Sequence, residues 1–173
     1  LEFGARSTGE PASLRDVVCD ASGLIDGLIF PTARPRVMHA ERTFWEKATA
    51  IHVFCHQDRL RGDRFARHWH DVARLHEAGL ADAAFADREL ANAVARHKSM
   101  FFAEKAADRS PIDYGAAVNG GLQLVPTGDG AKALEDDYAR MVEDGLLFDD
   151  AEPFEALMAR CADIAARANS TAK

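Results

Sequence analysis

The sequence predicts an α+β, mainly α protein, in which a small β segment at the N-terminus precedes a helical bundle-like body. Three observations support this fold class. Strand-like runs are confined to the first forty residues, whereas apolar residues recur with the period of a helix from residue 41 onwards. No stretch rich in Gly, Ser or Pro divides the chain. We therefore expect 1–40 to form the trailing part of a sheet and 41–173 to form a helical domain.

The strand-like runs of the first part are short. Residues 1–6 alternate apolar and polar side chains, as a half-buried strand does, and 7–11 have the composition of a turn. The apolar residues between 14 and 19 fit either a strand or a helical turn. Two further β-like runs, 28–30 and 36–38, each adjoin a proline.

The helical period predicts the elements that follow. We expect helices over 41–56, 67–78 and about 87–107, then around 134–145 and 154–164. Thr43 and Glu46 have the spacing of a capping box at the start of the first helix. A loop of about ten residues usually joins helices that pack antiparallel. The start of the first helix should therefore lie close to the second.

Composition limits the class of protein. The chain has 173 residues, of which 47% are apolar and 28% charged, values that are typical of one globular domain and exclude a disordered chain. No run approaches the roughly 20 apolar residues of a membrane span, and no signal segment opens the chain. Cys19, Cys55 and Cys161 are odd in number and widely spaced, which favours buried, reduced thiols. We expect a cytoplasmic protein without membrane contact.

The net charge of −7 hides an asymmetry along the chain. Residues 36–75 contain eight Lys or Arg against five Asp or Glu, together with five of the seven histidines. Residues 129–163 contain three basic side chains against eleven acidic ones. The acidic total argues against a general nucleic-acid coat, but the basic stretch could bind phosphate. The acidic stretch has two interpretations, the solvated faces of two helices or a docking surface.

Several common catalytic motifs are absent. The sequence has no GxxxxGK[ST] loop, no GxGxxG after a strand, no GxSxG elbow and no CxxC pair. His52 and His56 have a spacing that zinc sites use, but the Glu of HExxH is missing, so a buried core histidine is the favoured interpretation of His52.

Two dense stretches remain, HAERTFWEKATAIH over 39–52 and RFARHWHDVARL over 64–75. They resemble the AbiEii/AbiGii-type toxin family, nucleotidyltransferase-like proteins of bacterial toxin–antitoxin systems in which an ERTFWEK helix precedes an SRHYYDL-like helix. Residues 1–11 and the helical segments from 97 onwards are similar to the same family, so the resemblance covers nearly the whole chain.

The resemblance implies a polymerase-β-like nucleotidyltransferase whose Gly-Ser loop and Asp-x-Asp carboxylates hold divalent metals and a nucleoside triphosphate (NTP). This sequence contains neither motif, and it begins at Leu1 inside a strand-like run. We therefore expect the C-terminal portion of such an enzyme, inactive alone, whose β segment completes a nucleotidyltransferase-type sheet. The full-length protein is expected to use Mg²⁺ and an NTP to add nucleotides to an acceptor, with RNA, and tRNA in particular, as the candidate.

Nucleotidyl transfer needs cations on the triphosphate and a carboxylate that orients a reacting group. By resemblance, Lys47 takes the position of the lysine that faces the triphosphate, and Asp71 that of a later aspartate. The alternative from the residues themselves is a structural salt bridge between two helices. For the whole chain, the competing function is a non-catalytic helical module that binds RNA or protein.

Other polar residues extend the predicted site. Arg42 and Arg67 are expected to add phosphate contacts, although exposed arginines are often only surface charges. His68 replaces an acidic residue that the family often carries, and it is also a candidate phosphate ligand. Lys98, next to His97, is a candidate contact for phosphate or RNA, and the alternative is a polar residue on the exposed side of the predicted helix over 87–107. The resemblance further implies a cognate antitoxin, for which the acidic stretch around Glu135, Asp136 and Asp137 is the candidate surface.

Overall fold

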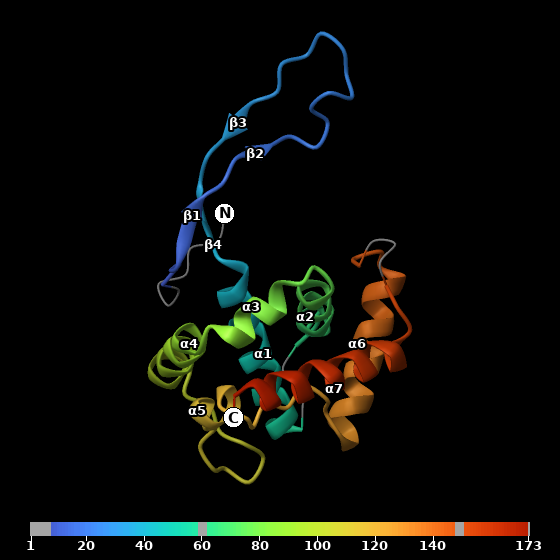
Figure 1. Cartoon of the computed structure of the whole chain (residues 1–173). Helices are drawn as coiled ribbons and strands as arrows, with labels where there is room; N and C mark the ends of the chain where they lie inside the picture. The colour runs from blue at the N-terminus through green and yellow to red at the C-terminus, as the bar shows by residue number, and fades with distance from the viewer. Residues whose placement is uncertain (1–7, 59–61, 148–150, 173) are drawn as a thin grey trace. The chain divides into compact units, whose positions relative to one another are not determined.

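The structure, a computed structural model, describes residues 8–58, 62–147 and 151–172. The chain forms two compact units, and the boundary between them falls between His39 and Ala40. Within the described residues there are seven helices and four short strands, so the predicted α+β, mainly α class is confirmed (Figure 1).

The first unit is an antiparallel β ribbon. Strand β1 (Ala12–Leu14) pairs with β4 (Arg36–Met38), and β2 (Val17–Val18) pairs with β3 (Thr32–Ala33). Of the undecided apolar residues between 14 and 19, Leu14, Val17 and Val18 are therefore in strands, whereas Cys19 is not. The predicted strand over 1–6 lies outside the described residues.

Two sequence predictions for this ribbon are wrong. Residues 28–30 are not a strand, because the chain opposite them between β2 and β3 forms turns and offers no backbone to pair with. Ile29 is consequently 99% exposed. Cys19 is a free thiol, as expected, but it is exposed instead of buried, as are its apolar neighbours Val17 and Val18.

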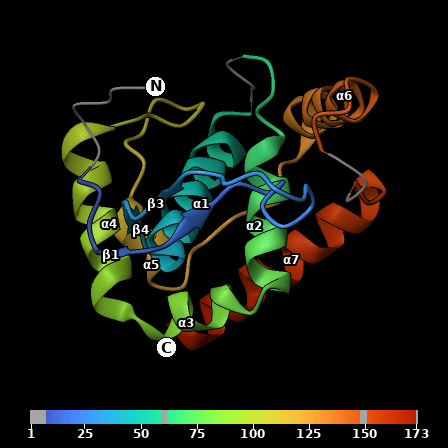
Figure 2. The ribbon, with the colours of Figure 1, turned by 90° about the horizontal axis from the view of Figure 1, so that it is seen from above.

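The second unit is built around one central helix. Helix α1 (Ala40–Gln57) contacts α2 (Arg67–Glu77), α3 (Leu80–Ala86) and α4 (Arg88–Phe101). Seen from above, α1 lies between α2 and α4 (Figure 2). Phe54, near the end of α1, has a ring contact with Trp69, near the start of α2. Lys47, earlier in α1, bonds to Asp71, later in α2. The two helices are therefore antiparallel, as the loop between them predicted.

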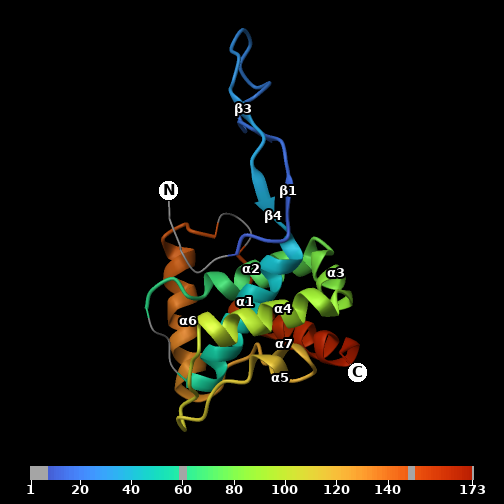
Figure 3. The same cartoon turned by 90° about the vertical axis from the view of Figure 1, so that its left-hand side faces the viewer.

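Three further helices complete this unit. They are α5 (Tyr114–Val118), α6 (Gly128–Glu143) and α7 (Phe154–Thr171). Helix α7 packs on α2, α3 and α6 (Figure 3). The sequence prediction missed the short helices α3 and α5, because neither is long enough to show a clear helical period.

The helix that was predicted over 87–107 ends at Phe101. The segment that follows is held against the end of α1 instead of continuing the helix. Gln57 Nε2 donates to the carbonyl of Lys105 at 2.9 Å, and the backbone N–H of Ala107 donates to the carbonyl of His56 at the same distance. Tertiary hydrogen bonds therefore override the helical pattern. The capping box is also wrong, since α1 begins at Ala40 and Thr43 is already within the helix.

The core of this unit surrounds α1. Phe44, Trp45 and Trp69 are fully buried, and Phe44 makes edge-to-face contacts with Trp45 and with Phe85 of α3. The polar N–H groups of both indoles are satisfied: Trp45 Nε1 donates to the carbonyl of Ala84, and Trp69 Nε1 donates to that of Leu124. The tryptophans are therefore structural, which leaves the polar residues of α1 and α2 to form a site.

Candidate functional site

Lys47 of α1 and Asp71 of α2 form an ion pair. Lys47 Nζ donates to Asp71 Oδ2 at 2.6 Å, and the two side chains are 25% and 38% exposed. The antiparallel packing of the helices brings these residues together although they are 24 positions apart. Because both groups remain partly exposed, a ligand can reach the pair from solvent.

His68 lies three residues before Asp71 on the same side of α2, and the charges of both Lys47 and Asp71 act on it. Burial lowers the pKa of His68 to about 4, and the nearby charges of Lys47 and Arg67 contribute to the lowering, against an opposing effect of Asp71. Its Nδ1 is buried without a hydrogen-bond partner among the described residues. His68 is therefore neutral near pH 7, so a contact from it to phosphate would be a hydrogen bond rather than an ion pair.

Arg42 and Lys98 both interact with Glu46 of α1. Arg42 is 4% exposed, and its Nε donates to Glu46 Oε1 at 2.8 Å. Burial lowers the pKa of Lys98, the charge on Glu46 raises it and that on Arg42 lowers it, so Lys98 shares this environment. Lys98 Nζ also lies 4.6 Å from the ring centre of Phe102. Arg42 thus reaches the site from the interior rather than as a surface ligand.

One ion pair and several electrostatic effects connect the six predicted site residues: Lys47 pairs with Asp71, both act on His68, and the charge of Arg42 acts on Lys98. Arg67 is exposed at the start of α2, and the charges of both Arg67 and Lys98 act on His68. We use the name basic cluster for these six residues together with Glu46: Arg42, Glu46, Lys47, Arg67, His68, Asp71 and Lys98. Four cationic side chains face two carboxylates, so the cluster carries excess positive charge and suits an anionic ligand.

The sequence predicts only a capping role for Glu46. The structure instead makes it the partner of Arg42 and a neighbour of Lys98. The signal that could have indicated this role is the i, i+4 spacing of Arg42 and Glu46, which places both on one face of a helix.

A cavity of about 250 Å³ opens beside the basic cluster. Lys98 lies in its lining, and most of the remaining lining is apolar or aromatic. The sequence did not predict this cavity, because α1, α4 and the segment after α4 form it together.

The N-terminal end of α2 is positioned by a buried carboxylate from α6. Asp137 is 1% exposed, and its two oxygens accept the backbone N–H groups of Arg64 and Ala66, each at 2.8 Å. Ala66 has no capping side chain of its own. Asp137 thus satisfies donors that a helix start leaves unpaired. Asp58, which follows α1, makes a similar contact with the start of α6: its Oδ1 accepts the backbone N–H of Gly130.

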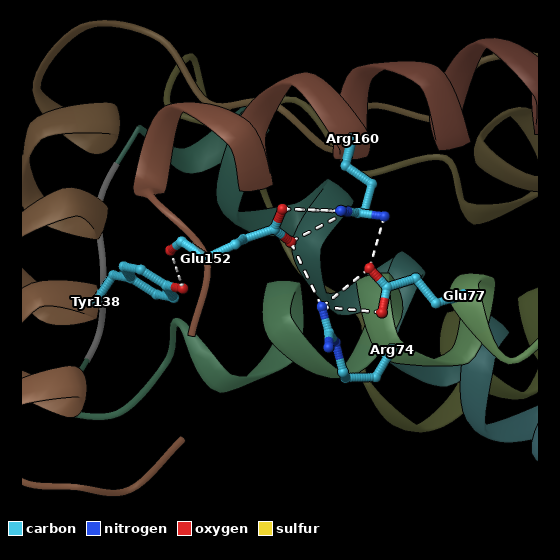
Figure 4. A network of polar contacts seen from close by, with 5 residues as sticks. All are labelled: Arg74, Glu77, Tyr138, Glu152 and Arg160. Carbon is cyan, nitrogen blue, oxygen red and sulfur yellow. Dashed lines mark hydrogen bonds and ion pairs between the residues drawn. The ribbon is translucent and has the colours of Figure 1, made fainter. Parts of the chain in front are cut away.

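The C-terminal end of α2 is held by an ion-pair network (Figure 4). Arg160 of α7 lies 2.6 Å from Glu77 and 3.0 Å from Glu152, and Arg74 lies 2.9 Å from Glu77. Tyr138 donates to the carbonyl of Glu152 at 2.7 Å. Helix α2, which carries His68 and Asp71, is therefore fixed at both ends.

These contacts change the interpretation of the acidic stretch over 129–163. Asp137 is buried, and Glu152 is engaged by Arg160 and Arg74. Glu135 and Asp136 are exposed. A docking surface for a basic partner would thus include Glu135 and Asp136, whereas including Asp137 in it is wrong.

His52 of α1 is structural. His52 is buried, and its Nδ1 accepts the N–H of Gln123 at 3.2 Å. Burial and the charge on His56 lower the pKa of His52 to about 4. Among the described residues, no group of three His, Cys, Asp or Glu side chains is placed to hold a metal ion. The described part of the chain also has no helix with the length and apolar character to cross a membrane.

A family model described as "Nucleotidyl transferase AbiEii toxin, Type IV TA system" matches residues 1–160. No curated protein and no solved structure matches the chain. The family match confirms the resemblance of the two dense stretches that contain Lys47 and Asp71.

Proposed function

This chain belongs to the AbiEii nucleotidyl transferase toxin family of type IV toxin–antitoxin systems, and on that premise we propose that it helps to transfer nucleotides from an NTP to an RNA acceptor. The observation that carries the proposal is the Lys47–Asp71 pair within the basic cluster. In the family such a site serves a toxin, and a cytoplasmic location would give it access to both NTP and RNA.

The chemistry of the pair suits this reaction. Charge builds on the phosphates during transfer, and a fixed cation is more effective there than one that must reorient. Asp71 holds the Lys47 ammonium through a 2.6 Å hydrogen bond, so the cation is oriented before the substrate binds. Arg67 and Lys98 add positive charge, and neutral His68 can offer a hydrogen bond. Lys47 is therefore proposed to contact the triphosphate and Asp71 to position Lys47.

The described residues do not supply a metal site. We propose that the Mg²⁺ of this reaction is held by carboxylates outside them, of the Gly-Ser and Asp-x-Asp kind that this sequence lacks. The chain alone would then be inactive, and no step assigned here to Lys47 or Asp71 involves the metal. Purified alone with NTP, Mg²⁺ and RNA, it should incorporate no nucleotide.

A second candidate function rests on the same ion pair. If Lys47 and Asp71 only tie α1 to α2, the excess positive charge could serve a non-catalytic module that binds RNA. That module would bind RNA without consuming NTP, and its affinity would fall with increasing salt.

Incorporation of labelled nucleotide into total tRNA and other RNA by the full-length protein tests the proposal. Lys47→Ala and Asp71→Ala should each lower the rate at least a hundredfold, which is typical of losing a preorganised charge. Arg167→Ala is a matched control, because it removes an interhelical ion pair with Asp82 outside the basic cluster. Wild-type rates in both cluster variants would exclude the two residues from the reaction.

A further inference from the structure

The 250 Å³ cavity has aromatic walls. Phe54 of α1, Phe65 of the loop before α2, and Phe102 and Tyr114 beyond α4 all contribute to its lining. Phe54 and Phe65 meet edge to face, with ring centres 4.3 Å apart, and the Tyr114 hydroxyl donates to the carbonyl of Phe102 at 2.6 Å. These contacts fix the walls before any ligand binds. A cavity of this size and composition fits a planar aromatic group.

Gln57 lines one end of the cavity. Gln57 is 6% exposed, and its Nε2 donates to Glu104 Oε2 at 3.1 Å and to the carbonyl of Lys105 at 2.9 Å. Because both partners are acceptors, the orientation of the amide is settled. Its Oε1 is buried with no hydrogen-bond partner among the described residues. A buried acceptor without a partner lowers the stability of the folded protein unless a ligand or water supplies a donor.

The cavity runs along α1 towards the basic cluster. Ala50, Val53, Phe54 and Gln57 line it from one face of the helix, over a length of about 10 Å. Lys47 lies one turn before Ala50 on this face. Lys98 shares the surroundings of Glu46, so it belongs to the end of the cavity opposite Gln57.

A ring contact provides a second link between cavity and cluster. Phe65 lines the cavity, and its ring centre lies 5.8 Å from that of His68. The cavity therefore has a lysine and the basic cluster at one end, and Gln57 with the carboxylate of Glu104 at the other. A ligand that carries phosphate would place it at the Lys98 end, where the lining supplies a cation.

We propose that this cavity binds a nucleobase, with an N–H donor of the base on Gln57 Oε1, the phenyl rings against its faces, and its phosphate directed past Lys98 towards Lys47. This proposal rests on the proposed function and adds the part of the substrate that the cavity binds. The base belongs either to the NTP or to the end of the RNA acceptor, since both present the same chemistry to the cavity.

Binding of nucleosides, which lack phosphate, tests the cavity separately from the reaction. In the full-length protein, saturation-transfer NMR should detect cytidine, adenosine or guanosine. Gln57→Leu should weaken this binding about tenfold, as expected for the loss of one hydrogen bond. Gln123→Leu is the matched control, because this exposed glutamine lies outside the cavity. Unchanged nucleoside affinity in Gln57→Leu would overturn the proposal.

A second variant guards against a folding defect in Gln57→Leu. Ala50→Leu fills the cavity from α1 and removes no polar group, so it should abolish nucleoside binding while unfolding remains cooperative. In the incorporation assay, a raised KM for NTP in this variant would assign the base to the NTP, and a raised KM for RNA would assign it to the acceptor. If neither KM rises, the cavity does not hold the base during transfer. Nucleoside binding that depends on Gln57 in a protein without incorporation activity would support the cavity and reject the proposed reaction.

Discussion

The Lys47 ammonium lies 2.6 Å from the Asp71 carboxylate and joins two antiparallel helices in the middle of the basic cluster. The contact depends on the placement of α2, which other parts of the chain fix at both ends. Asp137 binds the backbone before α2, and Arg160 bridges the end of α2 to Glu152. The geometry of the site therefore depends on residues that would never touch a substrate.

The first prediction concerns Asp137. Asp137→Ala leaves the N–H groups of Arg64 and Ala66 without their acceptor, and the loss of hydrogen bonds to a buried charged group should lower the free energy of unfolding by about 3 kcal/mol. Urea denaturation measures the change. Asp136→Ala, at the exposed neighbouring position, should change it by less than about 0.5 kcal/mol. Equal effects of the two variants would contradict the capping role of Asp137.

The second prediction concerns the close approach of Asp58 to α6. A Cβ atom at Gly130 would lie 2.8 Å from Asp58 Oδ1 and 3.3 Å from the Asp58 backbone. Gly130→Ala should therefore destabilise the protein by roughly 1–3 kcal/mol, although alanine favours helices. Gly62→Ala, where the added Cβ atom would meet a side chain at 3.4 Å, should have little effect. A more stable Gly130→Ala variant would show that this contact is looser than the structure indicates.

The third prediction concerns pH. The pKa of His68 is lowered to about 4 from the ordinary value of 6.5, so the unfolded chain takes up a proton on His68 below pH 6.5 while the folded chain does not. Stability from neutral His68 is therefore complete above pH 6.5 and is lost as the pH falls towards 4. In an NMR titration, the His68 imidazole should show no protonation at pH 5.5. A midpoint near 6.5 would contradict its burial among cations.

The fourth prediction concerns the acidic surface. We propose that exposed Glu135 and Asp136 contribute to docking of a basic antitoxin. The double variant Glu135→Lys/Asp136→Lys should then lower antitoxin affinity at least tenfold in a titration at low salt and leave the melting temperature nearly unchanged. Glu89→Lys, at an exposed site on α4, is the control. Unchanged antitoxin binding would remove this surface from the interaction.

Much of the fold could be predicted from sequence because its long helices are amphipathic. The period of Phe44, Ala48 and Ile51 indicates α1, and a short connection indicates that α1 and α2 are antiparallel. Those two features already place Lys47 near Asp71. The chemical interpretation of the pair, by contrast, came from the family resemblance and not from the period.

The remaining features depend on contacts between distant residues. Asp137 looks like any other acidic residue of an exposed helix, and only the fold shows that it accepts N–H groups 71 positions away at Ala66. Likewise, the end of α4 at Phe101 is decided by hydrogen bonds that Gln57 makes to the following segment. The cavity depends on the same contacts, so local patterns could not predict it.

The central claim is that Lys47, positioned by Asp71, contacts the substrate, and that the pair does not merely join two helices. The double variant Lys47→Met/Asp71→Leu tests it most directly, because it replaces the ion pair by apolar side chains of similar size and leaves neither charge unpaired. Urea denaturation and nucleotide incorporation into RNA are measured on the same full-length preparation. We predict a stability within about 1 kcal/mol of wild type and an incorporation rate at least a hundredfold lower. A stable double variant that incorporates nucleotides at the wild-type rate would contradict the claim.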